Sequence, residues 1–116
     1  MIADFRPASL DIQMWKNDTW QQVFSLTANN SAINLSAATV TIQVRTTATS
    51  PTAALTLTEG AGITVGGSLN NQITLKKIVD ISAGVYVWDL QVLYGDGTVK
   101  TYLEGSFEVY EDVTKI

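Results

Sequence analysis

Three carboxylates near the end of the sequence have a spacing that could place them together on a strand face. Asp89 lies on the less apolar face of the stretch 84–94, and Glu104 and Glu108 are four positions apart in the stretch 99–110. Alternate residues of a strand share a face, so a hairpin would set Asp89 across from this pair. Glycosidases use two carboxylates in such a position for catalysis. The ordinary interpretation is a solvated strand face, because charged side chains are usually exposed. We predict no catalytic residues and no enzymatic activity.

The sequence contains neither histidine nor cysteine. The absence of histidine removes the usual general base and the Ser-His-Asp arrangement. Without imidazole or thiolate ligands, zinc and iron-sulfur sites are not expected, and no disulfide can form. We therefore predict no metal and no cofactor, and a fold that depends on packing and hydrogen bonds alone.

The remaining polar and glycine-rich motifs are typical of turns. Asn17-Asp18 and Asp96 lack the spaced oxygen ligands of a calcium loop, and Asn and Asp are standard turn residues. Gly60-Ala61-Gly62 and Gly66-Gly67 do not open a helix, so they do not predict a phosphate-binding loop.

The aromatic residues divide into two groups by the strand face on which they fall. Trp20 and Trp88 fall on the apolar faces of their strands, which predicts that both lie in the core. Trp15 shares its face with polar residues, and Tyr102 and Tyr110 lie on the more polar face of the last strand. An exposed Trp15 beside either tyrosine would suit a protein interface or a sugar platform. The alternative is a set of isolated surface aromatics.

The stretch from Gly84 to Val109 positions most of these residues and predicts a long β-hairpin. Two runs of alternating apolar residues flank Gly95-Asp96-Gly97, which is a strong hairpin turn signal. The first run places Trp88 and Leu90 on its apolar face. The second places Thr101, Leu103, Gly105, Phe107 and Val109 on one face. An isolated hairpin is unstable in water, so a second layer must cover it.

The rest of the sequence predicts further short strands separated by turns. Residues 9–15 and 20–26 alternate cleanly and predict a second hairpin, and 38–46 predicts a half-buried strand. Residues 54–57 predict a short edge strand, and a helical or 3₁₀ turn is expected within 76–82. The count is about seven or eight strands, at the spacing of a β-sandwich.

Length and charge restrict the remaining classes of protein. A chain of 116 residues predicts one domain, and we divide it into an N-terminal arm at 1–8, a sandwich at 9–110 and a tail at 111–116. The net charge is -4, with scattered basic residues, which argues against nucleic-acid binding. No apolar run approaches the roughly 20 residues that cross a bilayer. No signal peptide is visible, which predicts synthesis and folding in a cytoplasm.

One family resemblance rests on the order of these strand motifs. Ser82-Ala83-Gly84-Val85-Tyr86-Val87-Trp88 resembles the entry to strand F of immunoglobulin-like sandwiches, where a tyrosine forms a corner. The order of motifs over about residues 9–113, through Leu103-Glu104-Gly105-Ser106-Phe107-Glu108-Val109, is similar to small bacteriophage and prophage structural proteins. The likeness is to the N-terminal immunoglobulin-like domain of siphophage upper baseplate proteins. It implies an all-β, immunoglobulin-like antiparallel β-sandwich.

The resemblance also implies a function. We expect a non-enzymatic virion component that is assembled in the host cytoplasm and acts in a tail, baseplate or fibre attachment, or as a head decoration. Its partners would be other virion proteins and copies of itself. We expect the contacts at the arm 1–7, the exposed Trp15 and the tail 110–116, with these candidate residues: Phe5, Arg6, Trp15, Tyr102 and Tyr110. The alternative is a carbohydrate-binding or host-adhesion module with an exposed aromatic platform.

Overall fold

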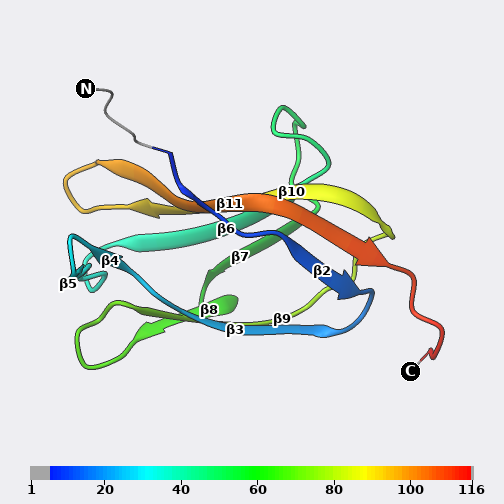
Figure 1. Ribbon diagram of the computed structural model, residues 1–116, viewed down its shortest axis with the longest axis horizontal. Coiled ribbons are helices and arrows are strands. Elements are labelled where there is room, and N and C mark those ends of the chain that lie inside the picture. Colours follow the sequence, from blue (N-terminus) through cyan, green and yellow to red (C-terminus); the bar gives the residue numbers. More distant parts are fainter. Residues whose placement is uncertain (1–5, 116) are drawn as a thin grey trace.

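The computed structural model describes residues 6–115 and contains strands and no helix in that part of the chain (Figure 1). The prediction of an all-β fold is confirmed. Eight of the strands have four or more residues, and the others are two-residue bridges. In chain order the strands are β1 Ala8–Ser9, β2 Ile12–Trp15, β3 Thr19–Ser25, β4 Thr27–Ala28, β5 Ser31–Ala32, β6 Thr39–Arg45, β7 Leu55–Glu59, β8 Gly62–Gly66, β9 Gln72–Ile78, β10 Gly84–Leu93 and β11 Val99–Tyr110.

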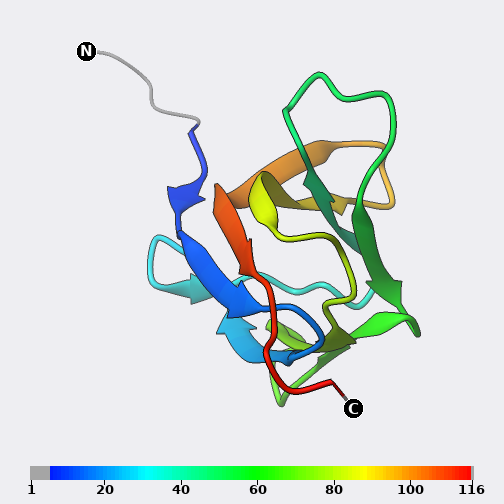
Figure 2. The same ribbon diagram turned by 90° about the vertical axis from the view of Figure 1, so that its right-hand side faces the viewer.

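Nine of these strands form one sheet that curls into two facing layers. The sheet order is β1-β11-β10-β6-β7-β8-β9-β3, with β2 also paired to β11, while β4 and β5 form a small separate sheet. The change of layer occurs where β7 and β8 share only a short parallel pairing, from Thr58 and Glu59 to Gly62 and Ile63. Figure 2 shows the curl from the side, with β8, β9 and β3 below the longer strands.

The core fills the space between the two layers. Trp20 of β3 and Trp88 of β10 are each 3% exposed, so the prediction that both are core residues is confirmed. Their rings meet edge to face at 5.5 Å, and Phe107 of β11 lies 5.1 Å from Trp20. Edge-to-face packing is a favourable geometry for aromatic rings. These three side chains therefore join the layers.

The long C-terminal hairpin is present as predicted. Strands β10 and β11 pair antiparallel, with Tyr86 opposite Phe107. The turn carries Gly97 at a φ of 91° and is closed by a hydrogen bond from the Thr98 amide to the Asp96 carboxylate at 2.9 Å. The left-handed φ explains the glycine, because side chains with a Cβ avoid that region.

A β-bulge in this hairpin makes part of the predicted face pattern wrong. Leu90 pairs with Leu103, but the next residue, Gln91, pairs with Thr101, so Tyr102 is the extra residue. A bulge shifts the alternation by one position. Thr101 consequently lies opposite Gln91 and not on the apolar face with Leu103, and Tyr102 packs against the core instead of lying on the polar face.

The predicted hairpin of residues 9–15 and 20–26 is wrong. Strand β2 runs parallel to β11, with Ile12 opposite Phe107, and β3 pairs antiparallel with β9. The turn between β2 and β3 passes from one layer to the other, and within it the Asn17 backbone amide donates to the Val79 carbonyl at 2.7 Å. Pairing with β11 places Ile12 and its neighbour Met14 next to the core, where both pack. Alternation alone cannot distinguish an antiparallel pairing of β2 with β3 from the parallel pairing of β2 with β11 that the structure has.

One smaller prediction holds for part of its strand, and another is wrong. Within residues 6–115, Leu55 to Leu57 of β7 pair only with β6 and form an edge, whereas Thr58 and Glu59 pair with β8. Residues 76–78 continue β9, and no helical turn occurs in 76–82. The ladder between β9 and β3 extends through Ile78. Its hydrogen bonds therefore use the backbone amides and carbonyls that a helical turn would need for its own hydrogen bonds.

Candidate functional site

The structure brings Trp15 and Tyr110 together into an exposed aromatic pair. The two residues are register partners across β2 and β11, and their ring centroids lie 5.1 Å apart with planes tilted by 47°. The Trp15 side chain is 53% exposed. Partial burial and the nearby Glu108 carboxylate raise the pKa of Tyr110. The two candidate interface residues therefore form one apolar patch, which is defined from here on as the aromatic pair.

Tyr102 does not belong to this patch. The bulge turns its side chain toward the core, where its hydroxyl is hydrogen-bonded to the hydroxyl of Tyr94. Burial, reinforced by the bond to Tyr102, raises the pKa of Tyr94 to about 12. The tyrosine pair thus stabilises the far end of the hairpin, and the prediction of Tyr102 as an exposed interface residue is wrong.

The other candidates lie at the N-terminus. Phe5 is outside the described residues. Arg6 is exposed and lies with Pro7, Ser9 and Glu104 around a small surface hollow. Arg6 is therefore separated from the aromatic pair by the length of β2.

A glycine in β11 allows the N-terminal segment to reach its place. The Leu10 carbonyl crosses so close to Gly105 that a Cβ there would lie 2.0 Å from its oxygen. That oxygen accepts a hydrogen bond from the Trp88 indole nitrogen at 2.9 Å. The Asp11 carboxylate accepts the Ser106 amide at 3.0 Å, which lowers the pKa of Asp11. A glycine inside a strand is the sequence signal for such a close approach.

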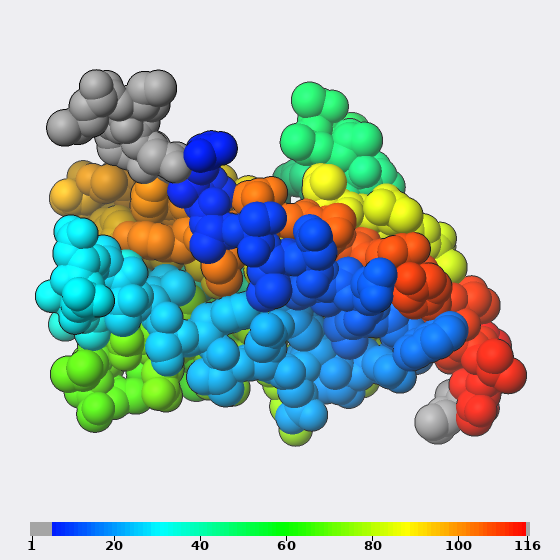
Figure 3. Space-filling model, in the orientation of Figure 1, coloured from blue at the N-terminus to red at the C-terminus, as the bar shows by residue number. Residues whose placement is uncertain are grey.

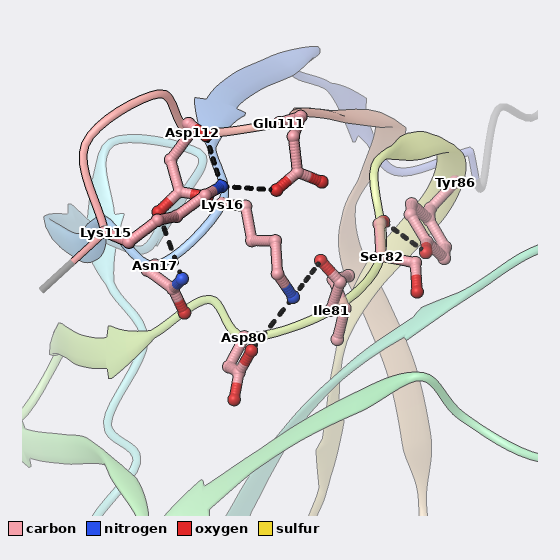
Figure 4. A network of polar contacts seen from close by, with 9 residues as sticks. All are labelled: Lys16, Asn17, Asp80, Ile81, Ser82, Tyr86, Glu111, Asp112 and Lys115. Atoms are coloured by element: carbon pink, nitrogen blue, oxygen red, sulfur yellow. Dashed lines mark hydrogen bonds and ion pairs between the residues drawn. The ribbon is translucent and has the colours of Figure 1, made fainter.

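The turn after β2 is joined to the C-terminal segment by polar contacts (Figure 4). The Asn17 side-chain amide donates to the Asp112 carboxylate at 3.2 Å, and Lys115 pairs with Asp112 at 2.6 Å. These bonds, with that from Lys115 first, lower the pKa of Asp112 to about 2. Lys16 pairs with Asp80 at 3.0 Å. The described part of the predicted tail is therefore held beside the aromatic pair.

Strands β1, β2 and β3 together form one side of the molecule, which we call the N-terminal side. Strand β2 lies above β3 on this side, as Figures 1 and 2 show. In Figure 3 residues of these strands, in shades of blue, occupy the middle of the face toward the viewer. Within residues 6–115, β2 pairs only with β11 and β3 pairs only with β9. Both strands therefore leave an edge open.

A groove of about 1090 Å³ lies elsewhere, on the outer face of β6, β10 and β11. The 48–51 loop and the N-terminal segment contribute to its lining, and sequence patterning did not reveal it because those segments are far apart in the chain. The lining combines the exposed apolar side chains of Val87, Leu93 and Val99 with a set of polar ones. The polar side chains on the three strands are Thr41, Gln43, Arg45, Asp89, Gln91, Glu104 and Ser106.

Asp89 lies at the centre of this groove. It is opposite Gln43 on β6 and opposite Glu104 on β11, so the carboxylates predicted to meet across the hairpin do so. Burial raises the pKa of Asp89, and the nearby Arg45 partly offsets this. The Arg45 guanidinium donates to Gln43 and to the Ser50 carbonyl, each at 2.7 Å. Glu108 lies apart, where it accepts a 3.5 Å hydrogen bond from Gln13.

Asp89→Asn is expected to stabilise the protein at neutral pH. A raised pKa in the folded state means that ionisation of Asp89 costs stability, so stability falls as pH rises from 3.8 through the folded pKa. We expect a gain of about 0.5 kcal/mol at pH 7, limited by solvent screening. The gain should diminish as pH falls toward 3.8 and vanish well below it, where Asp89 is protonated in both states. Urea unfolding at several pH values measures this gain in stability.

The control Glu104→Gln, at an exposed position, should give no comparable gain. Equal stability of Asp89→Asn and the wild type at pH 7 would contradict the burial argument.

The described residues contain no group of three or more acidic side chains placed to hold a metal ion. No helix in the same part of the chain is long and apolar enough to cross a membrane.

Two solved structures show a weak likeness to this chain. No protein-family model matches the chain, and no curated protein matches its sequence. CopC from Methylosinus trichosporium OB3b is similar over 66% of this chain and 67% of its own, with 17% identity and a TM-score of 0.41. SGBP-B from the Bacteroides ovatus mixed-linkage glucan utilization locus, solved with a mixed-linkage heptasaccharide, gives 16% identity and a TM-score of 0.39. All of this chain is covered, but only 24% of SGBP-B. Likenesses this weak assign neither a ligand nor a partner to the chain.

Proposed function

We propose that this protein is a non-enzymatic assembly module of a bacteriophage particle, with an immunoglobulin-like sandwich as its fold. Two features support the fold. The Tyr86 hydroxyl donates to the Ser82 carbonyl at 2.6 Å, which is a tyrosine corner (Figure 4). The N-terminal strand β2 pairs parallel to the last strand, β11, with Ile12 opposite Phe107. The resemblance at the sequence level supports the place in a virion, first in a tail, baseplate or fibre attachment and second as a head decoration.

The observation that carries the proposed function is the exposed aromatic pair on the N-terminal side. Large aromatic side chains are enriched at the centres of protein interfaces, where they supply much of the binding energy. Trp15 is held by its ladder position on β2 and by Tyr110, so little side-chain entropy is lost when a partner covers it. We propose other virion proteins and copies of this chain as the partners, with assembly in the host cytoplasm.

Trp15→Ala is expected to reduce incorporation into particles by about tenfold or more, since a central interface tryptophan contributes at least about 1.4 kcal/mol. The isolated protein should lose no more than about 1 kcal/mol of stability, because Trp15 is 53% exposed. Quantitative mass spectrometry of gradient-purified particles measures incorporation. Val85→Ala, at a residue 67% exposed on β10, is the matched control.

Three results would contradict the proposal. The wild-type chain could stay entirely in the particle-free fraction. Trp15→Ala could be incorporated as well as the wild type. Hydrolase activity lost on Asp89→Asn or Glu104→Gln would show instead that the carboxylates across the hairpin are catalytic.

A carbohydrate-binding or host-adhesion module is the second candidate. The groove favours it, because amide, hydroxyl and carboxylate side chains such as Gln43, Thr41 and Asp89 are the groups that hydrogen-bond sugar hydroxyls. The aromatic pair favours it less, since the 47° tilt of Trp15 against Tyr110 does not make a flat platform. Glycan-array binding that is lost on Asp89→Asn or Trp15→Ala would support this candidate. Trp15 buried between subunits would exclude it as the sugar platform.

A further inference from the structure

Strand β3 is the longest open edge on the N-terminal side. All seven residues from Thr19 to Ser25 pair in continuous register with β9, from Ile78 to Gln72. Within residues 6–115 no other strand pairs with β3. Alternate backbone amides and carbonyls of such a strand point away from its only neighbour. They form a regular row of unused hydrogen-bonding groups.

This edge lacks the features by which edge strands are usually protected. Natural edges carry lysine or other charges, proline, a bulge or a very short strand. The sequence of β3 is Thr-Trp-Gln-Gln-Val-Phe-Ser, without charge, proline or glycine, and its register has no bulge. Its outward side chain Val23 is 57% exposed. The opposite edge of the N-terminal side differs, because β1 and β2 are short and interrupted at Leu10 and Asp11.

We propose that β3 pairs antiparallel with β3 of a second copy, about a two-fold axis at Gln22. This inference rests on the proposed assembly function and names one contact by which it occurs. The pairing would join β8, β9 and β3 of two copies into one continuous sheet. Trp20 would oppose Phe24 of the second copy, and Gln21 would oppose Val23. Inward side chains thus meet inward ones, as the alternation of a sheet requires.

A second copy is the occupant that we propose, because the charge distribution permits self-association at this edge. Each chain carries a net charge of -4, so two copies repel one another over most of their surfaces. Strand β3 is neutral along its whole length, and its neighbour β9 contributes the basic pair Lys76 and Lys77. Two copies can therefore approach at this edge without opposing carboxylates. An antiparallel pair of identical strands is also complementary by symmetry.

The test uses double variants that share one substitution. Gln21 and Val23 are both exposed, and Gln21 lies opposite Lys76, so Gln21→Glu is compatible with the fold. Q21E/V23E places two carboxylates opposite each other in the proposed dimer. Q21E/V23K replaces each of these repulsive pairs by an ion pair. Q21E/V85E has the same net charge as Q21E/V23E but carries the second carboxylate on β10.

Sedimentation equilibrium of the full chain is expected to show a reversible dimer for the wild type, Q21E/V23K and Q21E/V85E. We expect Q21E/V23E to raise the dimer dissociation constant at least about tenfold, because like charges directly opposite are unfavourable in a ladder. Circular dichroism should show the same folded state for all four proteins. A monomeric wild type, or a Q21E/V23E dimer of unchanged affinity, would overturn the proposal. If Q21E/V23E and Q21E/V23K lost the dimer equally, the proposed pairing of Gln21 with Val23 would be overturned.

Failure here and failure of the proposed function give different results. A monomer that is still incorporated into particles would overturn the β3 contact and leave the assembly function standing. A dimer that never enters particles would overturn the virion function and leave the contact standing.

Discussion

Replacing Trp88 with alanine is expected to lower the free energy of unfolding by about 3 to 5 kcal/mol, as is typical when a large buried aromatic residue is truncated. The indole lies edge to face with Trp20 at 5.5 Å and is stacked with Phe24 at 6.4 Å. Its nitrogen also binds the Leu10 carbonyl. The substitution therefore leaves a cavity between the layers. It also removes the hydrogen bond that the Trp88 indole donates to the N-terminal segment at Leu10. Urea or thermal unfolding measures the loss.

Trp88→Phe and Trp15→Ala are the matched controls for this result. Trp88→Phe keeps most of the ring but loses the hydrogen bond, so it should cost less than alanine. Trp15→Ala removes a tryptophan that is 53% exposed, so its effect should be much smaller. If Trp88→Ala left stability unchanged, the assignment of inward and outward faces on β10 would be wrong.

Gly105→Ala is expected to lower stability by about 2 to 4 kcal/mol, combining a backbone clash with a lost hydrogen bond. The new Cβ would lie 2.0 Å from the Leu10 oxygen and 2.6 Å from its carbon, and neither can move without shifting the chain. We expect β1 and β2 to separate from β11. Trypsin should then cleave faster after Lys16, which follows β2.

Gly66→Ala is the control for the glycine itself. No atom lies within 4 Å of the Cβ position at Gly66, and the residue is not among the glycines with positive φ. Stability should change by no more than about 1 kcal/mol. A Gly105→Ala protein as stable and as protease-resistant as Gly66→Ala would show that the close approach of Leu10 is not needed.

The fold was predictable where local signals were strong. The turn at Gly95-Asp96-Gly97 and the long alternation on both sides specify β10, β11 and the burial of Trp88. Pairings between distant segments were not predictable in the same way. The alternation of residues 9–15 shows which side chains face inward, but it does not say that β2 joins β11 and not β3.

The candidate site was predictable only in part, for two physical reasons. Trp15 and Tyr110 were identified as exposed aromatics, yet their contact depends on the parallel register of β2 and β11. Tyr102 was misplaced because a single bulge reverses the alternation, and bulges leave little trace in a sequence. The groove around Asp89 was not predictable because its lining comes from three strands, the 48–51 loop and the N-terminal segment, which only the assembled fold brings together.

Assembly through the N-terminal side is tested most directly by amide hydrogen exchange of the chain in purified particles and in the isolated monomer. The account predicts slower exchange in the particle along β2 and β3, with the groove strand β6 unchanged. Unchanged exchange along β2 and β3, or protection confined to the groove around Asp89, would contradict it.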